Sequence, residues 1–378
     1  MMTNNTGSNP STRHPAALAM GPLRVSPNCW LVGHRNPASL LQCNTYLRIL
    51  DDGASGVRVC IDPGSQFDYS VVEANIQQLI GDVSEVNVLT LNHQDPDVVG
   101  NTAAMCDANP AAALIVSEDV WRLAQHLLIK PGTIQFANAA RTPKLALAVG
   151  HRWQAVPTPF CHFRGAMAFY DPEIRTLFSG DLFGGLNQLG RVHLFAESDD
   201  WQGVAQFHQI YMPTREVLRY AVRQIRALAP AVEVIAPQHG HVIVGDRIAE
   251  FLDRMHELLV GHDLLACELD ERYLRQYGEL IADLVAWAKE TMGDDEALGR
   301  LRPDRADDGL ERLVRVEGAD VTLVSEGYSA LAKVFARLAD GEPAEFVNSL
   351  RSMVLAGCST RGLPIPPIGA GVEGATYE

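Results

Sequence analysis

Residues 86–97 read VNVLTLNHQDPD and place three side chains of metal-binding type directly after a short apolar segment that is typical of a β-strand. Loops that follow strands carry the functional groups of open α/β sheets. His93, Asp95 and Asp97 occupy alternate positions in this loop, and Pro96 between the two carboxylates restricts the backbone. We therefore expect these three side chains to face one pocket.

Two more histidines and one more carboxylate follow other predicted strands. His162 comes after AVPTPFC, Asp181 after LFSG and His239 after VEVIAPQ. Three imidazoles and three carboxylates together suit two divalent metal ions, and Asp181 is the natural bridge because a carboxylate has two oxygens to share. Nitrogen and oxygen donors of this kind favour iron or manganese, with zinc also possible, and we expect no thiolate in the set.

The central part of the chain predicts a layered α/β domain. From residue 23 to residue 262, short β-rich segments alternate with helical patterns, and some neighbouring strands are spaced as β-hairpins. Helices are predicted over residues 71–80 and 216–228. Strands are predicted over residues 44–50, 56–61, 86–91, 112–116, 174–178 and 232–236.

The two ends of the chain differ from this central part. Residues 1–22 are rich in Asn, Ser, Thr and Pro, which predicts a mobile tail. Residues 263–378 show mostly helical patterns, for example the apolar spacing between residues 331 and 338. Three other segments are expected in this region: a loop over residues 294–312, a short hairpin over residues 313–324 and an extended or mobile segment after residue 362.

The composition excludes several classes of protein. Of 378 residues 47% are hydrophobic, and 31 basic against 46 acidic side chains give a formal net charge of −15. This charge argues against binding to nucleic acid or to an anionic membrane, both of which attract basic surfaces. The seven cysteines form no CxxC pair, so we expect buried free thiols. The polar start and the lack of a long apolar run favour a cytoplasmic protein.

Several motifs resemble those of the metallo-β-lactamase fold. Residues 43–47 (CNTYL) are similar to its N-x-Y-L strand, residues 61–64 (IDPG) to its D-x-G turn, and residues 93–97 stand in the place of its H-x-H-x-D-H signature. The resemblance spans roughly residues 24–260. It implies an αββα sandwich, to which a mostly helical C-terminal extension is attached. The later ligand positions of the family fall on His162, Asp181 and His239.

Within that superfamily, the sequence is similar to the flavodiiron proteins and to related oxygen-binding diiron proteins. Asp95 is a carboxylate where hydrolases usually have histidine, and residues 159–185 resemble the flavodiiron stretch from a ligand histidine to the bridging aspartate. The resemblance implies two iron ions. The implied ligands are His93, Asp95 and His162 for one iron, Asp97 and His239 for the other, and Asp181 as the bridge.

The sequence departs from the flavodiiron pattern at three points. Asp95 stands where glutamate is usual, and Val98 stands where histidine is frequent, which leaves the second metal one protein ligand short. Nothing after residue 260 resembles the phosphate loop of a flavodoxin domain, so no FMN site is predicted and electrons would come from an external redox partner. The family likeness suggests a homodimer.

Two functions are compatible with these features. The first is a non-haem diiron protein that binds O2 or NO, either as an oxygen sensor or as a reductase with an external electron donor. The alternative is a binuclear metallohydrolase that uses a metal-bound hydroxide on a phosphodiester, such as a cyclic dinucleotide, or on a thioester or lactone. In either case we expect Asp97 and Asp181 to take part in the chemistry.

Other side chains near the ligands have simpler interpretations. His241 follows His239 at two residues' distance, and we expect it to orient a ligand or to line the pocket. His193 and His208 are interpreted as structural residues. An apolar shell around the site is expected from Phe160, Phe163, Phe183 and Phe195.

Overall fold

The computed structural model describes residues 21–50, 56–137, 144–148, 150–188, 190–268, 270–302 and 309–368. Up to residue 257 its strands are β1 (Leu23–Ser26), β2 (Cys29–Leu31), β3 (Tyr46–Leu50), β4 (Val57–Ile61), β5 (Val88–Thr90), β6 (Ala113–Val116), β7 (Thr133–Phe136), β8 (Lys144–Ala148), β9 (His151–Pro157), β10 (Met167–Asp171), β11 (Thr176–Gly180), β12 (Val234–Pro237) and β13 (Ile243–Val244). The α-helices of this part are α1 (Tyr69–Ile80), α2 (Pro96–Val99), α3 (Thr102–Ala108), α4 (Glu118–Ala124), α5 (Trp201–Tyr211), α6 (Arg215–Arg226) and α7 (Asp246–Glu257).

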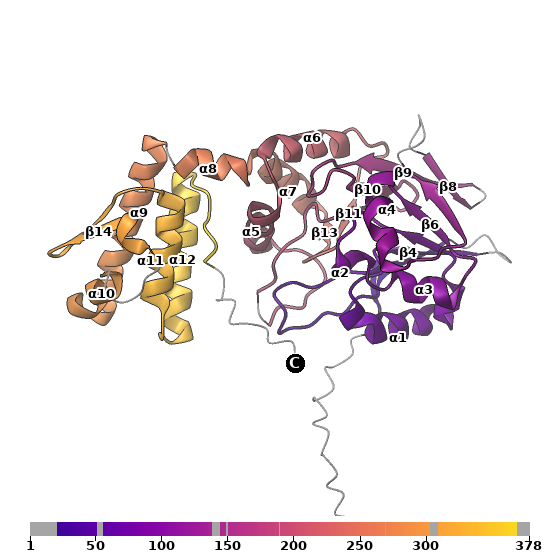
Figure 1. Cartoon of the computed structure of the whole chain (residues 1–378), viewed down its shortest axis with the longest axis horizontal. Coiled ribbons are helices and arrows are strands. Elements are labelled where there is room, and N and C mark those ends of the chain that lie inside the picture. The colour runs from indigo at the N-terminus through magenta and orange to yellow at the C-terminus, as the bar shows by residue number, and fades with distance from the viewer. Residues whose placement is uncertain are drawn as a thin grey trace, which may run out of the picture.

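The C-terminal part consists of α8 (His262–Glu268), α9 (Glu271–Met292), α10 (Asp294–Leu301), β14 (Val314–Glu317), β15 (Asp320–Leu323), α11 (Gly327–Ala339) and α12 (Ala344–Arg361). Short 3₁₀ helices are η1 (Gln66–Asp68), η2 (Val83–Glu85), η3 (Gln125–Leu127), η4 (Ser198–Asp200) and η6 (Leu310–Arg312). In Figure 1, α9 to α12 form a group of their own beside the α/β part, and α8 lies between the two. The predicted tail, residues 1–22, falls outside the described residues except for residues 21 and 22.

The predicted strands and helices of the α/β part are all present, with ends that lie within two residues of the predicted ones. The strand expected at residues 174–178 begins later, at Thr176. The reason is a tight hairpin, in which Asp171 pairs with Thr176 and Arg175 adopts a φ of +49°.

The strands form two sheets of mixed topology. The first has the order β1-β2-β3-β4-β5-β6-β7, antiparallel as far as β4 and parallel from β4 to β7. The second has the order β13-β12-β11-β10-β9-β8, in which β11 and β12 run parallel. The register of this parallel pair places Gly180 opposite Pro237. The residues that follow, Asp181 and His239, therefore emerge at the same edge of the sheet.

Alternating side chains on the strands create four layers. On β4, Ile61 packs in the core between the two sheets, whereas Cys60 packs against the helices α1, α3 and α4. On β11, Phe178 lies in the core between the sheets and Leu177 packs against α6 and α7. Both faces of each sheet are thus buried, which confirms the αββα sandwich of the metallo-β-lactamase type.

A buried ion pair joins the two sheets. Arg48 on β3 donates from Nε to Oδ2 of Asp171 on β10 at 2.9 Å, and both side chains are 2% exposed. Arg48 also donates to the backbone oxygen of Ile49, and Asp171 accepts from the backbone N–H of Glu173. These additional bonds offset part of the cost of removing two charges from water.

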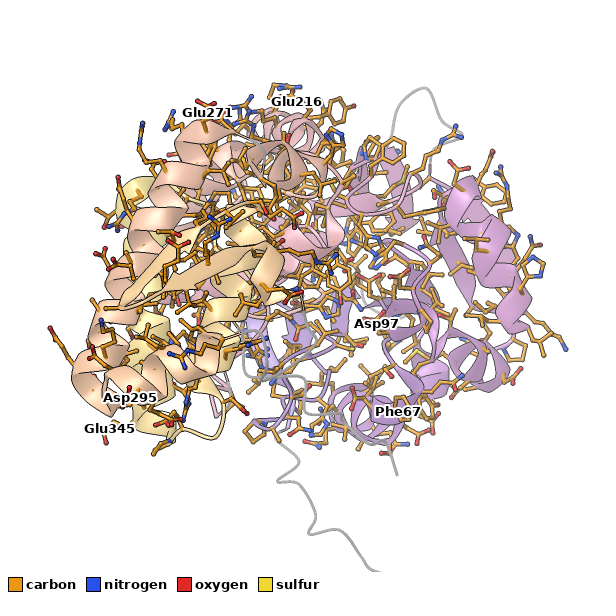
Figure 2. The ribbon with its side chains drawn as sticks, turned by 60° about the vertical axis from the view of Figure 1, so that its left-hand side comes forward. Phe67, Asp97, Glu216, Glu271, Asp295 and Glu345 are labelled. Carbon is orange, nitrogen blue, oxygen red and sulfur yellow. The ribbon has the colours of Figure 1, made fainter. Side chains whose placement is uncertain are left out.

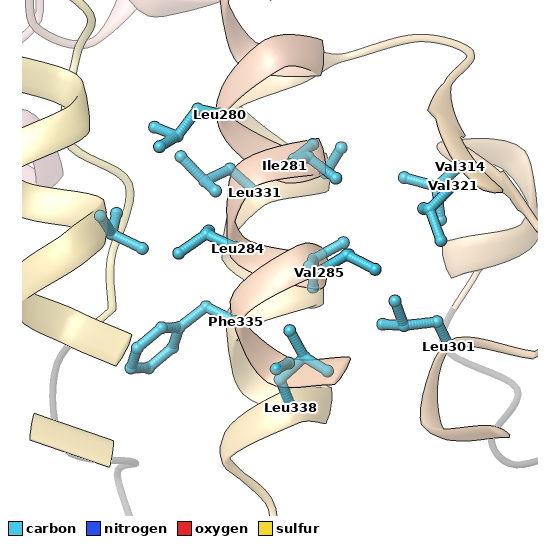
Figure 3. Packing of buried hydrophobic residues seen from close by; sticks show 14 of the residues in the cluster. Leu280, Ile281, Leu284, Val285, Leu301, Val314, Val321, Leu331, Phe335 and Leu338 are labelled. Carbon is cyan, nitrogen blue, oxygen red and sulfur yellow. The ribbon is translucent and has the colours of Figure 1, made fainter. Parts of the chain in front are cut away.

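The C-terminal helices surround a hydrophobic core of their own. In Figure 3, Leu331 and Phe335 of α11 lie beside Leu280 and Leu284 of α9, as expected from the predicted apolar face. The predicted hairpin is also present as β14 and β15. Its valines Val314 and Val321 complete the same core.

The loop expected over residues 294–312 is wrong in its first half, because α10 occupies Asp294–Leu301. Three acidic residues in its first turn favour the positive end of a helix dipole, and Ala297, Leu298 and Leu301 are buried against the C-terminal core. The charged residues around these few apolar positions made the helical pattern hard to recognise in the sequence. Residues 303–308 lie outside the described residues.

Helix α8 is bonded at both of its ends. At the first end, His262 N–H donates to the backbone oxygen of Pro213, and Asp263 accepts from the backbone N–H of Arg215, so α8 is held to the turn between α5 and α6. At the other end, Glu268 accepts from the backbone N–H groups of Tyr328 and Ser329 and thereby caps α11. This helix therefore connects the α/β part to the C-terminal core by specific bonds.

The described segment after Gly362, as far as residue 368, forms neither helix nor strand. Leu363 and Ile368 are buried against the C-terminal core, and Tyr277 of α9 donates its hydroxyl hydrogen to Pro364 at 2.8 Å. Throughout the described residues, none of the helices combines the length and the apolar character needed to cross a bilayer.

We expect Arg48→Met to lower the free energy of unfolding by about 3–5 kcal/mol, because it leaves Asp171 as a buried and unpaired charge. Urea denaturation followed by circular dichroism measures this. Arg48→Met/Asp171→Leu should lose less than the single variant. Arg175→Met is the matched control, since Arg175 forms an exposed pair with Glu233 and its loss should cost about 1 kcal/mol or less. Equal losses for the two arginine variants would contradict the role of the buried pair.

Candidate metal centre

The structure brings all six predicted ligand residues to one edge of the sandwich. They lie at the starts of loops or helices that follow strands: His93 after β5, Asp95 and Asp97 at the start of α2, His162 between β9 and β10, Asp181 after β11 and His239 after β12. In Figure 2, Asp97 lies within the α/β part, apart from Glu271, Asp295 and Glu345 on the C-terminal helices. The site thus belongs to the α/β part.

Four of these residues form a first group. The ligand atoms of His93, Asp95, His162 and Asp181 all lie within 4.8 Å of one another. His162 Nε2 lies 2.9 Å from Asp95 Oδ2 and 3.2 Å from Asp181 Oδ2, and His93 Nε2 lies 3.4 Å from the same Asp181 oxygen. This arrangement of two imidazoles and two carboxylates could hold one cation.

A second group shares Asp181 with the first. His239 Nε2 lies 3.4 Å from Asp181 Oδ1 and 3.4 Å from Asp97 Oδ2. The two oxygens of Asp181 therefore face different histidines: Oδ2 faces His93 and His162, whereas Oδ1 faces His239. This is the geometry that a carboxylate needs to bridge two ions.

A cysteine that the sequence analysis left out completes the second group. The Sγ atom of Cys43 and the ligand atoms of Asp97 and His239 lie within 4.8 Å of one another. The pKa of the Cys43 thiol is raised, first by burial and then by the neighbouring charges of Asp97, Asp68 and Asp181. Its place directly before Asn44 of the N-x-Y-L strand was the only signal in the sequence, because spacing alone does not show that this strand adjoins His239.

The site is buried at its base and open on one side. His93, Asp181 and His239 are between 1% and 3% exposed. The side chains of Asp95 and Asp97 are 32% and 30% exposed, so solvent reaches the two carboxylates from their side. Buried charges of this kind are costly unless they are paired or bind metal.

The carboxylates and imidazoles stabilise each other's charges. Burial opposes ionisation of Asp181, but His93, His239 and His162 outweigh it and hold the pKa of this carboxyl below its usual range. Burial likewise opposes protonation of His239, and Asp181 and Asp97 nevertheless raise its pKa. The hydrogen bond to Asp95 raises the pKa of His162. The charged forms of Asp181, His162 and His239 therefore favour the charged forms of their neighbours.

Hydrogen bonds to the backbone orient the ligand loops. His239 donates from Nδ1 to the backbone oxygen of Gln42 at 2.8 Å, which leaves Nε2 free to face the site. Gln238 donates from its side chain to the backbone oxygen of Asp97 at 3.0 Å. Gly180 has a φ of +61°, and a Cβ there would lie 2.9 Å from the Cβ of Asn92. Only glycine lets the Asp181 loop approach the His93 loop this closely.

Val98 does not contribute to the site. It is fully buried among the apolar residues between the first sheet and its helices. The departure noted at this position therefore removes a ligand from the second group, as expected. Asp95 keeps a local contact instead, since Gln94 donates to its Oδ1 at 2.7 Å.

The expected aromatic shell is only partly correct. Phe183 is buried and Phe163 is partly buried, whereas Phe160 and Phe195 are 48% and 41% exposed. An aromatic wall comes instead from α5, whose spacing gave no hint of its contacts. The ring centroid of Phe207 lies 5.1 Å from that of His239, and the ring centroid of Tyr211 lies 5.8 Å from that of His162.

His193, Asp200 and His241 form a third group that is less suited to a metal ion. The rings of His193 and His241 stack in parallel at 4.0 Å, so their nitrogens lie side by side instead of surrounding one point. Arg35 lies 3.0 Å from His241 Nδ1, and Arg191 lies 3.5 Å from Asp200. Two guanidinium groups would repel a cation. His241 is therefore part of this polar cluster.

His208 connects helix α5 to the loop that contains Asp181. It donates from Nδ1 to the backbone oxygen of Val204 and accepts at Nε2 from the backbone N–H of Phe183. Burial lowers the pKa of His208 to about 4, so the ring is neutral at pH 7. Its interpretation as a structural residue is consistent with these bonds.

The fold, together with the side chains at this edge of the sandwich, defines a class of protein. It is a β-lactamase-like sandwich with histidines and aspartates at the ends of its strands. The family model described as ODP family beta lactamase matches residues 41–240, more than half of the chain. The chain belongs to this family.

The individual relatives have low sequence identity to this chain. The type A flavoprotein fprA of Rhodobacter capsulatus is 26% identical over 251 residues, which cover 62% of this chain and 56% of that protein, so the chain spans about half of this relative's length. A solved chemotaxis sensor ODP, described as a peroxy diiron species, is 24% identical with a TM-score of 0.52 and covers 65% of this chain and 98% of its own.

A third similar structure is the rubredoxin oxygen:oxidoreductase of Desulfovibrio gigas. It has a TM-score of 0.57 at 15% identity and covers 70% of this chain and 68% of its own. At these identities, the two structures establish the fold that this chain shares with them.

We expect His208 to make the stability of the metal-free protein depend on pH. The folded state keeps the ring neutral down to about pH 4, whereas the unfolded chain takes up the proton below about pH 6.5. The contribution of His208 to stability should therefore fall by roughly 3 kcal/mol as the pH drops from about 6.5 to about 4. Urea denaturation across this range should show a shallower decline for His208→Gln. His126→Gln, which changes an exposed histidine, should follow the wild type; parallel curves for all three proteins would refute the assignment.

Proposed function

We propose that this protein is a non-haem diiron protein that binds O2 or NO, as a sensor or as a reductase that receives electrons from an external partner. The position of Asp181 carries the proposal. Its Oδ2 lies 3.4 Å from His93 Nε2 and 3.2 Å from His162 Nε2, and its Oδ1 lies 3.4 Å from His239 Nε2. One buried carboxylate thus offers an oxygen to each of two groups of ligand-type side chains.

These residues suit a pair of cations better than a network of hydrogen bonds. Considering every described residue, His93 Nε2 and Asp181 Oδ1 are buried atoms without a hydrogen-bond partner. Leaving such an atom unsatisfied costs about 1–3 kcal/mol. A cation beside each oxygen of Asp181 would satisfy both atoms. Two divalent ions would also exceed the charge of the three aspartates and attract an anionic oxygen ligand.

Iron is the metal that we propose for the site. Imidazole and carboxylate donors suit iron and manganese, and they also accept zinc. Membership of the ODP family supports iron, because the solved sensor of that name is described as a diiron species. A reduced iron pair would supply electrons to a bound diatomic molecule.

The remaining side chains of the site prepare it for such a ligand. Asp97 lies at the open side, where its carboxylate could hold or pass on a proton during reduction. Phe207, which is buried, and Tyr211, which is 42% exposed, place aromatic rings beside His239 and His162. Asp181 lies at the closed base, where it fixes the distance between the two halves of the site.

We further propose a division of labour between the two parts of the chain. Residues 23–262 would form the diiron domain, and residues 263–378 would form a helical region for pairing of two copies or for passing on a signal. The separate hydrophobic core of the second part supports this division. The bonds of α8 to the turn after α5 support communication, because α5 also carries Tyr211.

Asp181→Ala should reduce the binding of both metal ions, because it removes the one side chain that faces both groups. Asp95→Ala should weaken one ion by about 100-fold or more while the other remains, since loss of outer contacts alone costs 10–100-fold. Anaerobic titration with Fe²⁺ and metal analysis measure the number and affinity of the ions. Asp253→Ala, an exposed aspartate on α7, is the control. Two tightly bound ions in Asp181→Ala would exclude the bridging role.

The ferrous protein should develop a visible absorption band when it meets O2, because oxidation creates ligand-to-iron charge-transfer transitions. Anaerobic loading with two Fe²⁺ per chain, followed by rapid mixing with O2 or with NO, tests this by optical spectroscopy. Asp181→Ala should give little or no band. A wild-type protein that binds two Fe²⁺ and stays colourless with both gases would overturn the proposal, and cleavage of a phosphodiester by the Mn²⁺-loaded protein would favour a metallohydrolase instead.

A further inference from the structure

We infer that Cys43 supplies a thiolate ligand to the metal ion that faces Asp97, His239 and one oxygen of Asp181. The inference rests on the proposed two-metal function and assigns a ligand that neither the family pattern nor the ligand set expected from the sequence contains. It makes the two halves of the site chemically different. One half consists of imidazole and carboxylate donors, and the other includes sulfur.

The first support is the position of the thiol. Cys43 Sγ lies within 4.8 Å of the ligand atoms of both Asp97 and His239. Asp181 Oδ1 lies 3.4 Å from His239 Nε2 and is the buried oxygen for which the described residues offer no hydrogen-bond partner. An unsatisfied oxygen of a side chain that is 3% exposed thus lies beside His239, which belongs to the same group as the thiol.

The second support is the way in which the chain holds Cys43 against His239. The residue before it, Gln42, accepts the Nδ1–H of His239 through its backbone oxygen at 2.8 Å. The residue after it, Asn44, donates its backbone N–H to Gln238 at 2.6 Å and its side-chain amide to Gly240 at 3.0 Å. Cys43 is therefore fixed between two residues that are both bonded to the loop of His239.

Close packing behind the loop restricts it further. A Cβ on Gly33 would lie 2.5 Å from the backbone oxygen of Cys43, so the chain needs glycine there for this approach. Ligands held by rigid neighbours bind metals with less loss of entropy than flexible ones. The backbone at Cys43 is thus held in place by contacts with neighbouring residues, as the loop of His239 is.

The third support is the missing ligand at Val98. Val98 is buried in the outer core, so the second ion has only Asp97, His239 and the shared Asp181 among the ligands expected from the sequence. Cys43 raises this number to four, which is the usual coordination number where thiolates bind zinc, and it supplies a negative charge. On binding, the S–H bond is replaced by a sulfur–metal bond and one proton is released to solvent.

Sulfur in one half changes the metal preference of the pair. Soft thiolate donors favour ions such as Zn²⁺ and Co²⁺ more than Mn²⁺, whereas the half with His93 and Asp95 keeps a preference for harder ions. The two halves should therefore fill in a defined order when the protein meets Co²⁺ or Zn²⁺. The half with Cys43 should fill first.

Cobalt is the probe for the first test, because thiolate coordination to Co²⁺ gives a near-ultraviolet charge-transfer band that nitrogen and oxygen ligands do not give. Anaerobic titration of the full chain should produce this band with the first equivalent of Co²⁺. Cys43→Ser should lack the band and bind that ion about 10–100-fold more weakly. Cys267→Ser, a cysteine on α8, is the control and should keep the band. Thermal melting of the metal-free variants verifies that they fold.

Three outcomes distinguish the inference from the proposed function. A band that Cys43→Ser abolishes supports both. Two bound Co²⁺ ions without a thiolate band, or a band unchanged in Cys43→Ser, would overturn the role of Cys43 and leave the two-metal proposal intact. No binding of Co²⁺ by the wild-type protein would overturn both.

A second measurement uses the wild-type protein alone. Cys43 is the one cysteine of the seven, all of which lie in described segments, that is not buried. Its partial exposure lets iodoacetamide reach the sulfur in the metal-free protein, and mass spectrometry of the peptides measures the rate of modification. One equivalent of Co²⁺ should slow this modification by about 10-fold or more if the sulfur is coordinated. An unchanged rate in the metal-loaded protein would contradict coordination.

Discussion

The site depends on one buried negative charge. Asp181 is 3% exposed and would be costly to bury alone, yet three imidazoles surround it at 3.2 to 3.4 Å. The sandwich provides these imidazoles because strands of both sheets end at the same edge. The parallel pair β11 and β12 delivers Asp181 and His239 together, and β5 of the other sheet delivers His93. The αββα fold thus serves to bring side chains from distant parts of the sequence around one carboxylate.

The sequence alone was sufficient to predict where this happens. Polar residues that follow apolar segments identified His93, Asp181 and His239, because the ends of strands are set by local patterns that can be recognised in one chain. The four layers followed from the resemblance of several motifs to the metallo-β-lactamase fold. Register between distant strands leaves no such local signature. For this reason Cys43, which is adjacent to His239 only through the pairing of loops, was missed, as was the aromatic wall of α5.

Errors elsewhere have a similar origin. Helix α10 was expected to be a loop because charged residues outnumber its three buried apolar ones, and packing against the C-terminal core outweighs that local preference. Phe160 and Phe195 were expected to belong to an apolar shell around the site, but both side chains are largely exposed. Tertiary contacts therefore decided each of these cases.

The double attachment of α8 has a mechanical consequence. A connection that is anchored at Pro213 on one side and at Ser329 on the other resists bending, unlike a flexible tether. A displacement of the end of α5 would therefore move α8 and, through it, α11 together with the bundle of C-terminal helices. Two copies paired through their bundles, as proposed above, would in turn hold the two proposed metal sites at a fixed spacing and mutual orientation.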